Sequence, residues 1–380
     1  MISIRLALCI LLVAAAEHAR AADTPRDISP LIKPILEKHK LPGMAGLILD
    51  GESISAIGVN GVRKSGGTEL IARDDLFHLG SCTKSMTATL IGMLVEEGKL
   101  SWSSTIGEIF ADKKMDPLWR AVTLEQVLTH HGGAPADLNP GGLWSRLCKR
   151  KGTPIEQRIE LLEGVLGQPP AAAPGKTYIY SNAGYAIAGA MAEKVTGTAW
   201  EELMRKRLFD PLGMSSAGFG APGKAGSVDQ PWGHRANGTP VEPGPNADNP
   251  PAIGPAGTVH STLGDWSKYI ALHLQAAQGQ PRLLKSETFK KLHTPGVGDD
   301  SYAMGWGVAE RGWAAGRTLS HSGSNTMWYV VVWIAPGKNF AVLAASNQGG
   351  DVAAKACDDL CGALIADHNA HASPKPGEKK

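Results

Sequence analysis

Ser81 and Lys84 are the residues whose types and spacing first suggest chemistry. They lie three positions apart at the start of an apolar stretch that predicts a helix over 81–97, so they share one helical face. Ser81 would then occupy the first turn, where backbone N–H groups and the helix dipole favour developing negative charge. A lysine desolvated beside a serine hydroxyl can lose its proton and act as a base. The pair indicates a serine nucleophile, although such a spacing also arises by chance.

Tyr180 and Asn182 form a second candidate group, directly before a predicted helix over 183–195 that ends at Gly197. A phenol close to a lysine ammonium has a lowered pKa, and its phenolate can take or return a proton. Asn182 offers both a donor and an acceptor, which suits holding a lysine head and a substrate carbonyl. Taken alone, the pair is more typical of a half-buried tyrosine followed by an asparagine helix cap.

The third motif is a run of four residues at the end of a predicted strand: His321, Ser322, Gly323 and Ser324. The glycine would let a substrate lie against the strand edge. The N–H of Ser324 could join that of Ser81 in an oxyanion hole, and His321 could orient the Tyr180 oxygen or a substrate carboxylate. Taken alone, this run is more typical of a turn with a solvated histidine.

Strands are expected at both ends of the chain, with helices between them. The predicted strands are 44–49, 53–59, 317–319, 327–334 and 340–346, and the predicted helices outside the motifs are 28–40, 265–278 and 351–366. Asp50-Gly51 is a strong hairpin signal between the first two strands. The sequence therefore predicts an α+β fold, an α/β sandwich. In it, an antiparallel sheet from both chain ends is flanked by the terminal helices and carries an inserted all-helical domain.

The same pattern predicts where the segments divide. We expect residues 22–84 and 256–368 to form the α/β domain, 85–255 the helical insert, and 369–380 a disordered tail. Within the insert, 221–255 is crowded with Gly, Pro and Asn and should be a long loop.

The first residues, 1–21, are typical of a signal peptide. Arg5 precedes a short apolar run over 6–16, and Ala19-Arg20-Ala21 supplies small residues for cleavage. We expect an exported protein, periplasmic or secreted, with no stable membrane anchor after cleavage. The alternative is an uncleaved anchor or a buried first helix.

Composition argues against several other classes of protein. With 38 basic and 36 acidic residues the formal charge is +2, which provides no electrostatic case for a nucleic-acid partner.

Adjacent His130 and His131 point apart and lack a spaced carboxylate, so no metal site is expected. We expect His130 to belong to a loop that caps a helix beside the cleft. We expect Trp232, Trp306 and Trp328 either to line that cleft or to pack at the domain junction.

In their order along the chain, the three motifs resemble the serine beta-lactamase and penicillin-binding-protein superfamily. The tyrosine of the second motif resembles class C beta-lactamases, D-aminopeptidases and DD-peptidases of that branch, and family VIII carboxylesterases. Flanking segments that share the resemblance are 77–81, Leu128-Thr129-His130, Pro174-Gly175 and 302–306. The match spans roughly residues 28 to 366 and implies the sheet-plus-insert fold expected above.

The resemblance implies roles for the site residues. Ser81 would be the nucleophile, Lys84 its partner, and Tyr180 the general base and later acid, with either of the last two taking the first proton. Substrate-binding groups would be Asn182, His321, Ser322, Gly323 and Ser324, with the backbone of Ser81 and Ser324 as the oxyanion hole. No metal and no cofactor is implied.

One departure from the family pattern bears on substrate. Beta-lactamases of this branch usually carry Lys-Thr-Gly as the third motif, whereas this chain has His321-Ser322-Gly323. Histidine is neutral or half-charged near pH 7, which weakens a fixed anion clamp, while Ser322 keeps the hydroxyl.

We therefore expect a secreted serine hydrolase that forms a Ser81 acyl-enzyme with carboxylic esters or small amides. A class C-like beta-lactamase, or a D-amino-acid peptidase or DD-peptidase, is the main alternative. A non-catalytic binder of cell-wall fragments is a third. For the two hydrolase alternatives the partner is a small-molecule ester, amide or beta-lactam substrate, and the sequence leaves the oligomeric state open.

Overall fold

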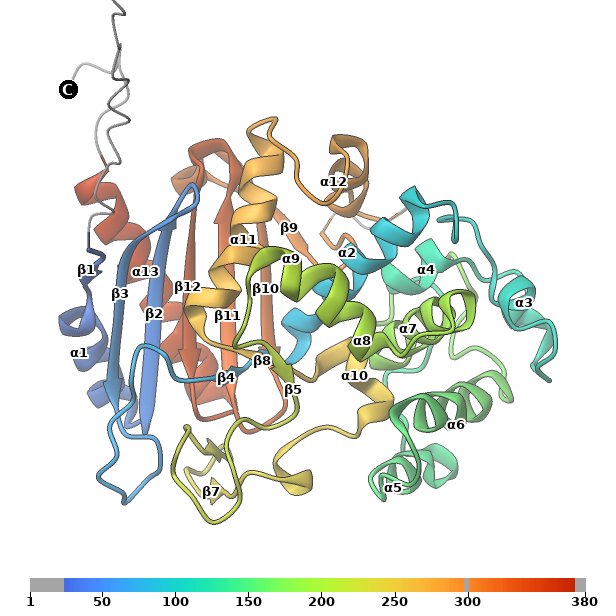
Figure 1. The fold of residues 1–380 in the computed structure, drawn as a ribbon, viewed down its shortest axis with the longest axis horizontal. Helices are drawn as coiled ribbons and strands as arrows, with labels where there is room; N and C mark the ends of the chain where they lie inside the picture. Colours follow the sequence, from blue (N-terminus) through green and yellow to red (C-terminus); the bar gives the residue numbers. More distant parts are fainter. Residues whose placement is uncertain (1–23, 297–300, 373–380) are drawn as a thin grey trace, which may run out of the picture.

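A seven-stranded sheet forms the centre of the protein (Figure 1). The computed structural model describes residues 24–296 and 301–372, so the expected signal peptide lies outside the described residues. The sheet order is β1-β3-β2-β12-β11-β10-β9. The strands are β1 Arg26–Asp27, β2 Gly43–Asp50, β3 Ser53–Gly61, β9 Gly307–Arg311, β10 Gly316–Ser324, β11 Tyr329–Ala335 and β12 Phe340–Ser346.

The two chain ends meet in the middle of this sheet. β2 pairs antiparallel with β12, Leu47 opposite Leu343, and all other neighbours are antiparallel except β1 and β3. β12 is buried along its whole length, because both faces of the sheet are covered. The predicted sheet built from both ends of the chain is confirmed.

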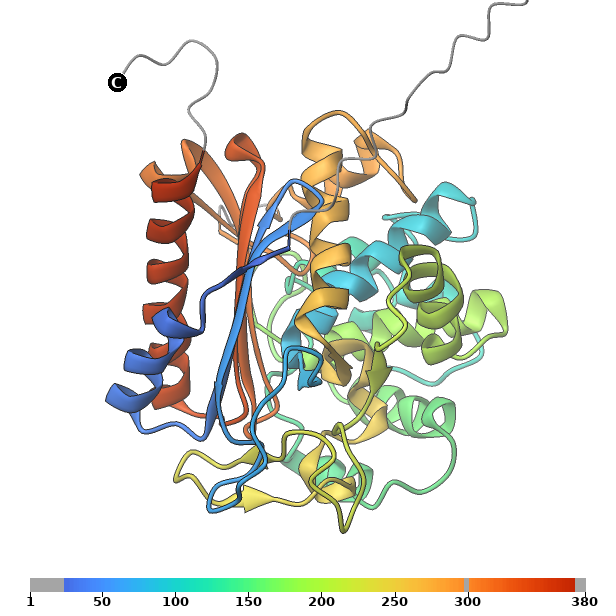
Figure 2. The same ribbon diagram turned by 60° about the vertical axis from the view of Figure 1, so that its left-hand side comes forward.

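Helices cover both faces of the sheet (Figure 2). α1, Ser29–His39, packs beside α13, Asp351–His371, on one face, and α11, Leu263–Ala277, packs on the other face against β2 and β12. The predicted terminal helices are therefore present and lie side by side. α13 extends to His371, three residues into the segment expected to be disordered, and residues 373–380 lie outside the described residues.

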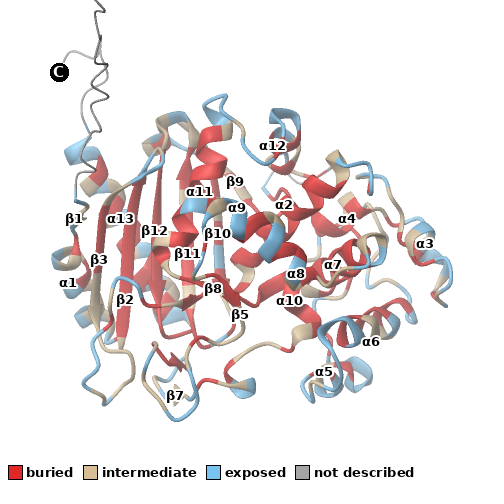
Figure 3. Cartoon of the chain, in the orientation of Figure 1, coloured by how far each residue is buried: buried red, intermediate tan, exposed pale blue. Residues whose placement is uncertain are grey.

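The middle of the chain forms a helical layer beside α11. Its helices are α2 Thr83–Glu96, α3 Ile106–Ile109, α4 Leu124–Leu128, α5 Leu143–Leu147, α6 Pro154–Leu166, α7 Asn182–Thr196, α8 Trp200–Met204, α9 Asp210–Leu212, α10 Gly254–Gly257 and, later in the chain, α12 Ser286–Leu292. Of the helices longer than ten residues in this layer, α2 and α7 are buried over most of their length (Figure 3). Arg158 of α6, fully buried, pairs with Glu193 and Glu201 and so ties α6 to α7 and α8.

The segment 85–255 is not entirely helical. It contains β5 at Gly218–Phe219, which pairs with β8 (Val259–Ser261), itself paired with β4 (Phe77–His78). The stretch expected to be one long loop also carries the β6–β7 hairpin, Gly233–His234 with Pro240–Val241. β5, β6 and β7 are two residues long and each contains Gly or Pro, so the sequence has no alternating apolar pattern that would predict them.

Two features of the last sheet strands also differ from expectation. β9 was not predicted, because its exposed end, Glu310 and Arg311, is typical of a loop. β10 extends five residues beyond its predicted end, to Ser324, because pairing with β11 stabilises a segment of low strand propensity. No helix of the described ranges has the length and apolar character needed to cross a membrane.

The backbone of β10 packs closely against the turn before α2. A Cβ on Gly323 would lie 1.9 Å from the Leu79 carbonyl oxygen, and one on Gly80 would lie 2.3 Å from the Ser324 amide nitrogen. Gly80 also has φ +49°, which favours glycine. The two glycines therefore allow the third motif to touch the backbone that precedes Ser81.

This contact predicts that Gly323→Ala is destabilising, because neither backbone can move aside without breaking strand pairing. We expect a loss of about 1–3 kcal/mol in the free energy of unfolding, measured by urea titration. Gly312→Ala is the matched control, since nothing lies within 4 Å of its Cβ position. Equal stability of the two variants would contradict the prediction.

Candidate active site

Lys84 is the most enclosed polar group at the site. Its side chain is fully buried in the first turn of α2, and Ser81, one turn earlier, is partly exposed. The Nζ atom lies 3.1 Å from Ser81 Oγ, 2.7 Å from Asn182 Oδ1 and 2.9 Å from the Ala256 carbonyl oxygen. The acceptors thus come from the 3-10 turn Gly80–Cys82 that precedes α2, from α7 and from α10. The predicted Ser81–Lys84 pair does share one face of this turn.

Burial changes the charge of this lysine. Desolvation lowers the pKa of Lys84 to about 7, because the charged form loses its water. The rings of Tyr180 and Tyr185, with centroids 4.7 and 5.6 Å from Nζ, favour the ammonium but do not offset the loss. Near neutral pH, the protonated and the neutral form of Lys84 are therefore both populated.

Tyr180 lies on the open side of the same group. Its hydroxyl hydrogen-bonds Ser81, while the residue as a whole is 37% exposed. Burial around the hydroxyl raises the pKa of Tyr180. The expectation that the lysine lowers this pKa is wrong: desolvation disfavours the phenolate, and a half-neutral Lys84 offers little compensating charge. Tyr180 is a phenol, not a phenolate, in the unliganded site.

Asn182 is the first residue of α7 and is positioned by the residue before it. Ser181 caps the helix by accepting a hydrogen bond from Gly184 N–H, at 3.3 Å. Asn182 Oδ1 is thereby held as the acceptor closest to Lys84 Nζ. The expected asparagine cap is therefore displaced by one position, which leaves the Asn182 side chain free to reach the lysine.

His321 belongs to β10 and is neutral. Its Nδ1 donates to the Ser322 carbonyl at 2.6 Å, so Nε2 accepts from the Tyr302 hydroxyl at 3.3 Å. Burial, with a smaller contribution from Lys84, lowers the pKa of His321 to about 4. The third motif therefore holds no fixed positive charge at neutral pH.

The hydroxyls of the third motif point away from the lysine. Ser322 is exposed on the opposite face of β10 from His321 and bonds Tyr329. Ser324 Oγ donates to the Trp328 carbonyl at 2.6 Å, which closes the turn after β10. Only the backbone of Ser324 lies against the turn before α2, so the structure brings Ser81, Lys84, Tyr180 and Asn182 together but leaves the Ser322 hydroxyl apart.

His130 is a site residue that the sequence indicated only as part of a loop. It is 2% exposed, and its ring centroid lies 4.4 Å from that of Tyr180. Nδ1 accepts from the Ser181 N–H at 3.1 Å, so the proton is on Nε2, which has no partner among the described residues. Its φ of +63° is unusual for histidine. No pattern in one sequence distinguishes such a buried histidine from a solvated one.

The three tryptophans that we expected beside the cleft or at the domain junction are all buried. Trp306 and Trp328 are at most 1% exposed, and Trp232 is 9% exposed. No group of three His, Cys, Asp or Glu side chains in the described part of the chain has the geometry to hold a metal ion.

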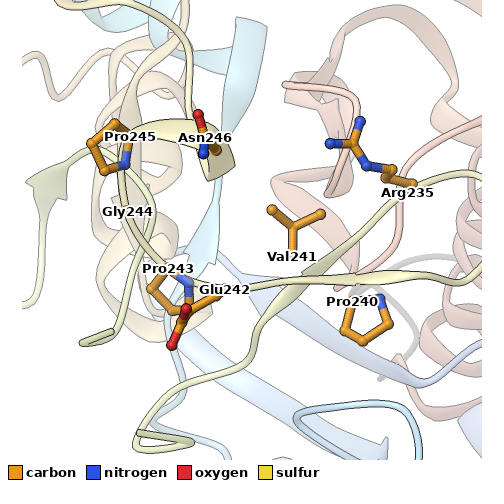
Figure 4. A pocket seen from close by; sticks show the side chains of 8 residues that line it. All are labelled: Arg235, Pro240, Val241, Glu242, Pro243, Gly244, Pro245 and Asn246. Carbon is orange, nitrogen blue, oxygen red and sulfur yellow. The ribbon is translucent and has the colours of Figure 1, made fainter. Parts of the chain in front are cut away.

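A surface hollow of about 420 Å³ lies apart from this chemistry (Figure 4). It is lined by Arg235, Pro240, Val241, Glu242, Pro243, Gly244, Pro245 and Asn246. None of the predicted site residues lines it, so it is a feature of the β6–β7 hairpin and the following loop.

The chain is similar to known proteins of one family. A family model described as Beta-lactamase matches residues 28–361. Unguisins hydrolase ungD' of Aspergillus campestris (strain IBT 28561) is 25% identical over 339 residues, which are 85% of this chain and 61% of that relative. Penicillin-binding protein 4 of Amycolatopsis lactamdurans is 28% identical over 346 residues, which are 87% of this chain and 86% of the relative. The chain thus spans less than two thirds of the first relative.

Among solved structures, the octameric penicillin-binding protein homologue from Pyrococcus abyssi superimposes with a TM-score of 0.71. The two chains are 23% identical, and the match covers 90% of this chain and 76% of that one. At this identity the likeness shows a shared fold.

The low pKa of Lys84 predicts an unusual titration. We expect the ¹³Cε resonance of Lys84 to titrate near pH 7, and those of ordinary lysines near pH 10.4. Between these values the unfolded chain binds a proton that the folded chain lacks, so this group makes stability rise with pH across that window. Lys84→Met should remove the resonance and the slope. A Lys84 midpoint above pH 9 would contradict the prediction.

Proposed function

Because this chain belongs to the beta-lactamase family of serine hydrolases, we propose that it hydrolyses carboxylic esters or small amides through an acyl-enzyme on Ser81. The observation that carries the proposal is the contact between Ser81 Oγ and the buried Lys84, whose pKa of about 7 allows it to accept a proton at neutral pH.

We assign the first proton transfer to Lys84. In its neutral form two N–H bonds hold Asn182 Oδ1 and the Ala256 carbonyl, and the lone pair faces the Ser81 hydroxyl. Lys84 takes that proton as Ser81 Oγ attacks the substrate carbonyl carbon. Tyr180 is the poorer base, because its raised pKa keeps it protonated.

The remaining steps use groups that adjoin this pair. The tetrahedral oxyanion forms next to the backbone amides of Ser81 and Ser324. Tyr180, hydrogen-bonded to Ser81, donates its proton to the leaving alcohol or amine and regains one from the Lys84 ammonium as the acyl-enzyme forms. A water molecule then attacks the ester carbonyl, loses its proton to this pair, and releases the acid as Ser81 is reprotonated.

The neutral third motif favours substrates without a carboxylate. A beta-lactam or a peptide with a C-terminal carboxylate would need a cation where His321, with a pKa lowered to about 4, supplies none. We therefore rank esters and neutral amides above a beta-lactamase or D-peptidase activity. The likeness to a penicillin-binding protein keeps that activity as the second candidate.

A non-catalytic binder accounts less well for the site. Burying an amine and lowering its pKa destabilises the folded protein below about pH 10. A site that only binds a ligand does not require a neutral lysine, so this loss of stability would serve no function there. Export, to the periplasm or beyond the cell, is the remaining part of the proposal and rests on the sequence of residues 1–21.

The acyl-enzyme can be detected by intact-protein mass spectrometry over time after addition of p-nitrophenyl butyrate. We expect a transient butyryl adduct on the wild type and none on Ser81→Ala, because only the Ser81 hydroxyl can hold the acyl group. Benzylpenicillin in place of the ester tests the second candidate: a penicilloyl adduct that turns over would indicate a beta-lactamase, and one that persists a penicillin-binding protein. Absence of an adduct and of turnover with all substrates would contradict the proposal.

Two substitutions test the proton-transfer roles. Lys84→Met and Tyr180→Phe should each lower kcat/KM for the ester by about 10²-fold or more, because each removes a proton carrier and keeps most of the volume. In the wild type, kcat/KM should rise with pH through about 7 and then level off, as Lys84 loses its proton. Lys113→Met, at a lysine ion-paired to Glu163 outside the site, is the control. Near-normal turnover of either site variant would exclude the corresponding role.

A further inference from the structure

We propose that Asp248 and His78 are positioning residues for the proposed oxyanion hole, acting through the backbone amide of Gly80. The proposal rests on the proposed function of Ser81. His78 Nε2 lies 2.7 Å from Asp248 Oδ1, and His78 Nδ1 lies 3.1 Å from the Gly80 nitrogen. Both side chains are almost wholly buried, His78 completely. They lie in β4 and in the segment between β7 and α10.

The contacts determine which nitrogen of His78 carries the proton. A backbone N–H can only donate, so Nδ1 must accept from Gly80 and the ring proton must be on Nε2. Asp248 stabilises that tautomer because its carboxylate can only accept. Without Asp248, the ring could carry its proton on Nδ1 and would then repel the Gly80 amide.

Gly80 matters because of what touches it. Its left-handed backbone, at φ +49°, turns the chain between β4 and Ser81, and its Cα lies so near Ser324 that an added Cβ would be 2.3 Å from the Ser324 nitrogen. The orientation of this one residue therefore sets how the Ser81 and Ser324 amides face each other. Misplacement of such groups by about 1 Å can cost a rate factor of about 10².

Asp248 is itself held rigidly. Arg150 donates from one terminal nitrogen to the backbone carbonyls of Pro245, Asp248 and Asn249, at 2.7, 2.7 and 2.9 Å. The His78 ring stacks on Trp328, with centroids 5.7 Å apart. Asp248, through its backbone, and the His78 ring are thus each held by a further contact besides the one between them. Such contacts are expected for residues that position the Gly80 amide.

A rescue experiment separates positioning from general support of the fold. An asparagine at position 78 places its carbonyl oxygen to accept from the amide two residues later, as in an Asx turn, and needs no partner carboxylate. Asn can therefore replace the function of His78 toward Gly80 in the absence of Asp248, although it does not refill the volume that the imidazole and the carboxylate occupied.

The variants are Asp248→Ala, His78→Ala, and the double variant His78→Asn with Asp248→Ala, assayed in the full chain with p-nitrophenyl butyrate. We expect the two alanine variants to lower kcat by about 10–100-fold with KM changed less than about threefold. The double variant should recover kcat to within about threefold of the wild type. It should remain as thermally destabilised as Asp248→Ala, because the cavity is still present.

Asp359→Ala is the matched control, since Asp359 pairs with His39 at 2.8 Å on the far face of the sheet. It should change the melting temperature and leave kcat unaltered. Asp248→Asn provides a second test that leaves no cavity: its amide no longer selects one tautomer, so kcat should fall severalfold while the protein stays folded.

The proposal is overturned if Asp248→Ala and Asp248→Asn retain wild-type kcat, or if the double variant recovers stability but not kcat. A double variant that remains as slow as Asp248→Ala would overturn it as well. Failure of the proposed function has a different signature, because the wild type itself would then show no Ser81-dependent turnover.

Discussion

The burial of one amine organises this site. Lys84 Nζ is surrounded by Ser81 Oγ, Asn182 Oδ1 and the Ala256 carbonyl, with no exposed surface. The acceptors lie on three separate segments, so the turn before α2, α7 and α10 must be positioned to within a hydrogen-bond length for the lysine to be tolerated in the interior. The same enclosure lowers its pKa and makes it a usable base.

The rest of the fold supplies the rigidity that this arrangement needs. The buried Arg158 holds α7 to α6 and α8 and donates to the Pro251 carbonyl, just before α10. Across the site, close packing at Gly80 and Gly323 brings β10 against the turn that carries Ser81. Ion pairs therefore fix the helices of the helical layer to one another, and backbone contacts couple this layer to the sheet beside Ser81.

Much of this arrangement was predictable from local patterns. The spacing of Ser81 and Lys84, the position of Tyr180 and Asn182 before a helix, and the strands at both chain ends carry signals in residue type and period. The β6–β7 hairpin, β9 and the full extent of β10 do not, because short or edge strands of Gly, Pro, Ser and charged residues acquire their form from their pairing partners. The outward orientation of Ser322 has the same origin, since alternation along β10 turns it away from His321.

The sequence by itself determined the chemical types and their order along the chain: a hydroxyl and an amine one turn apart, a phenol and an amide before a second helix, and a histidine where a cation is usual. Only the tertiary structure decided their protonation, because a pKa depends on solvent exclusion by residues distant in sequence. Burial lowers the pKa of Lys84, keeps Tyr180 a phenol and holds His321 neutral. The tertiary structure also places His78, Asp248 and His130 near the site, and no spacing along the chain reveals that proximity.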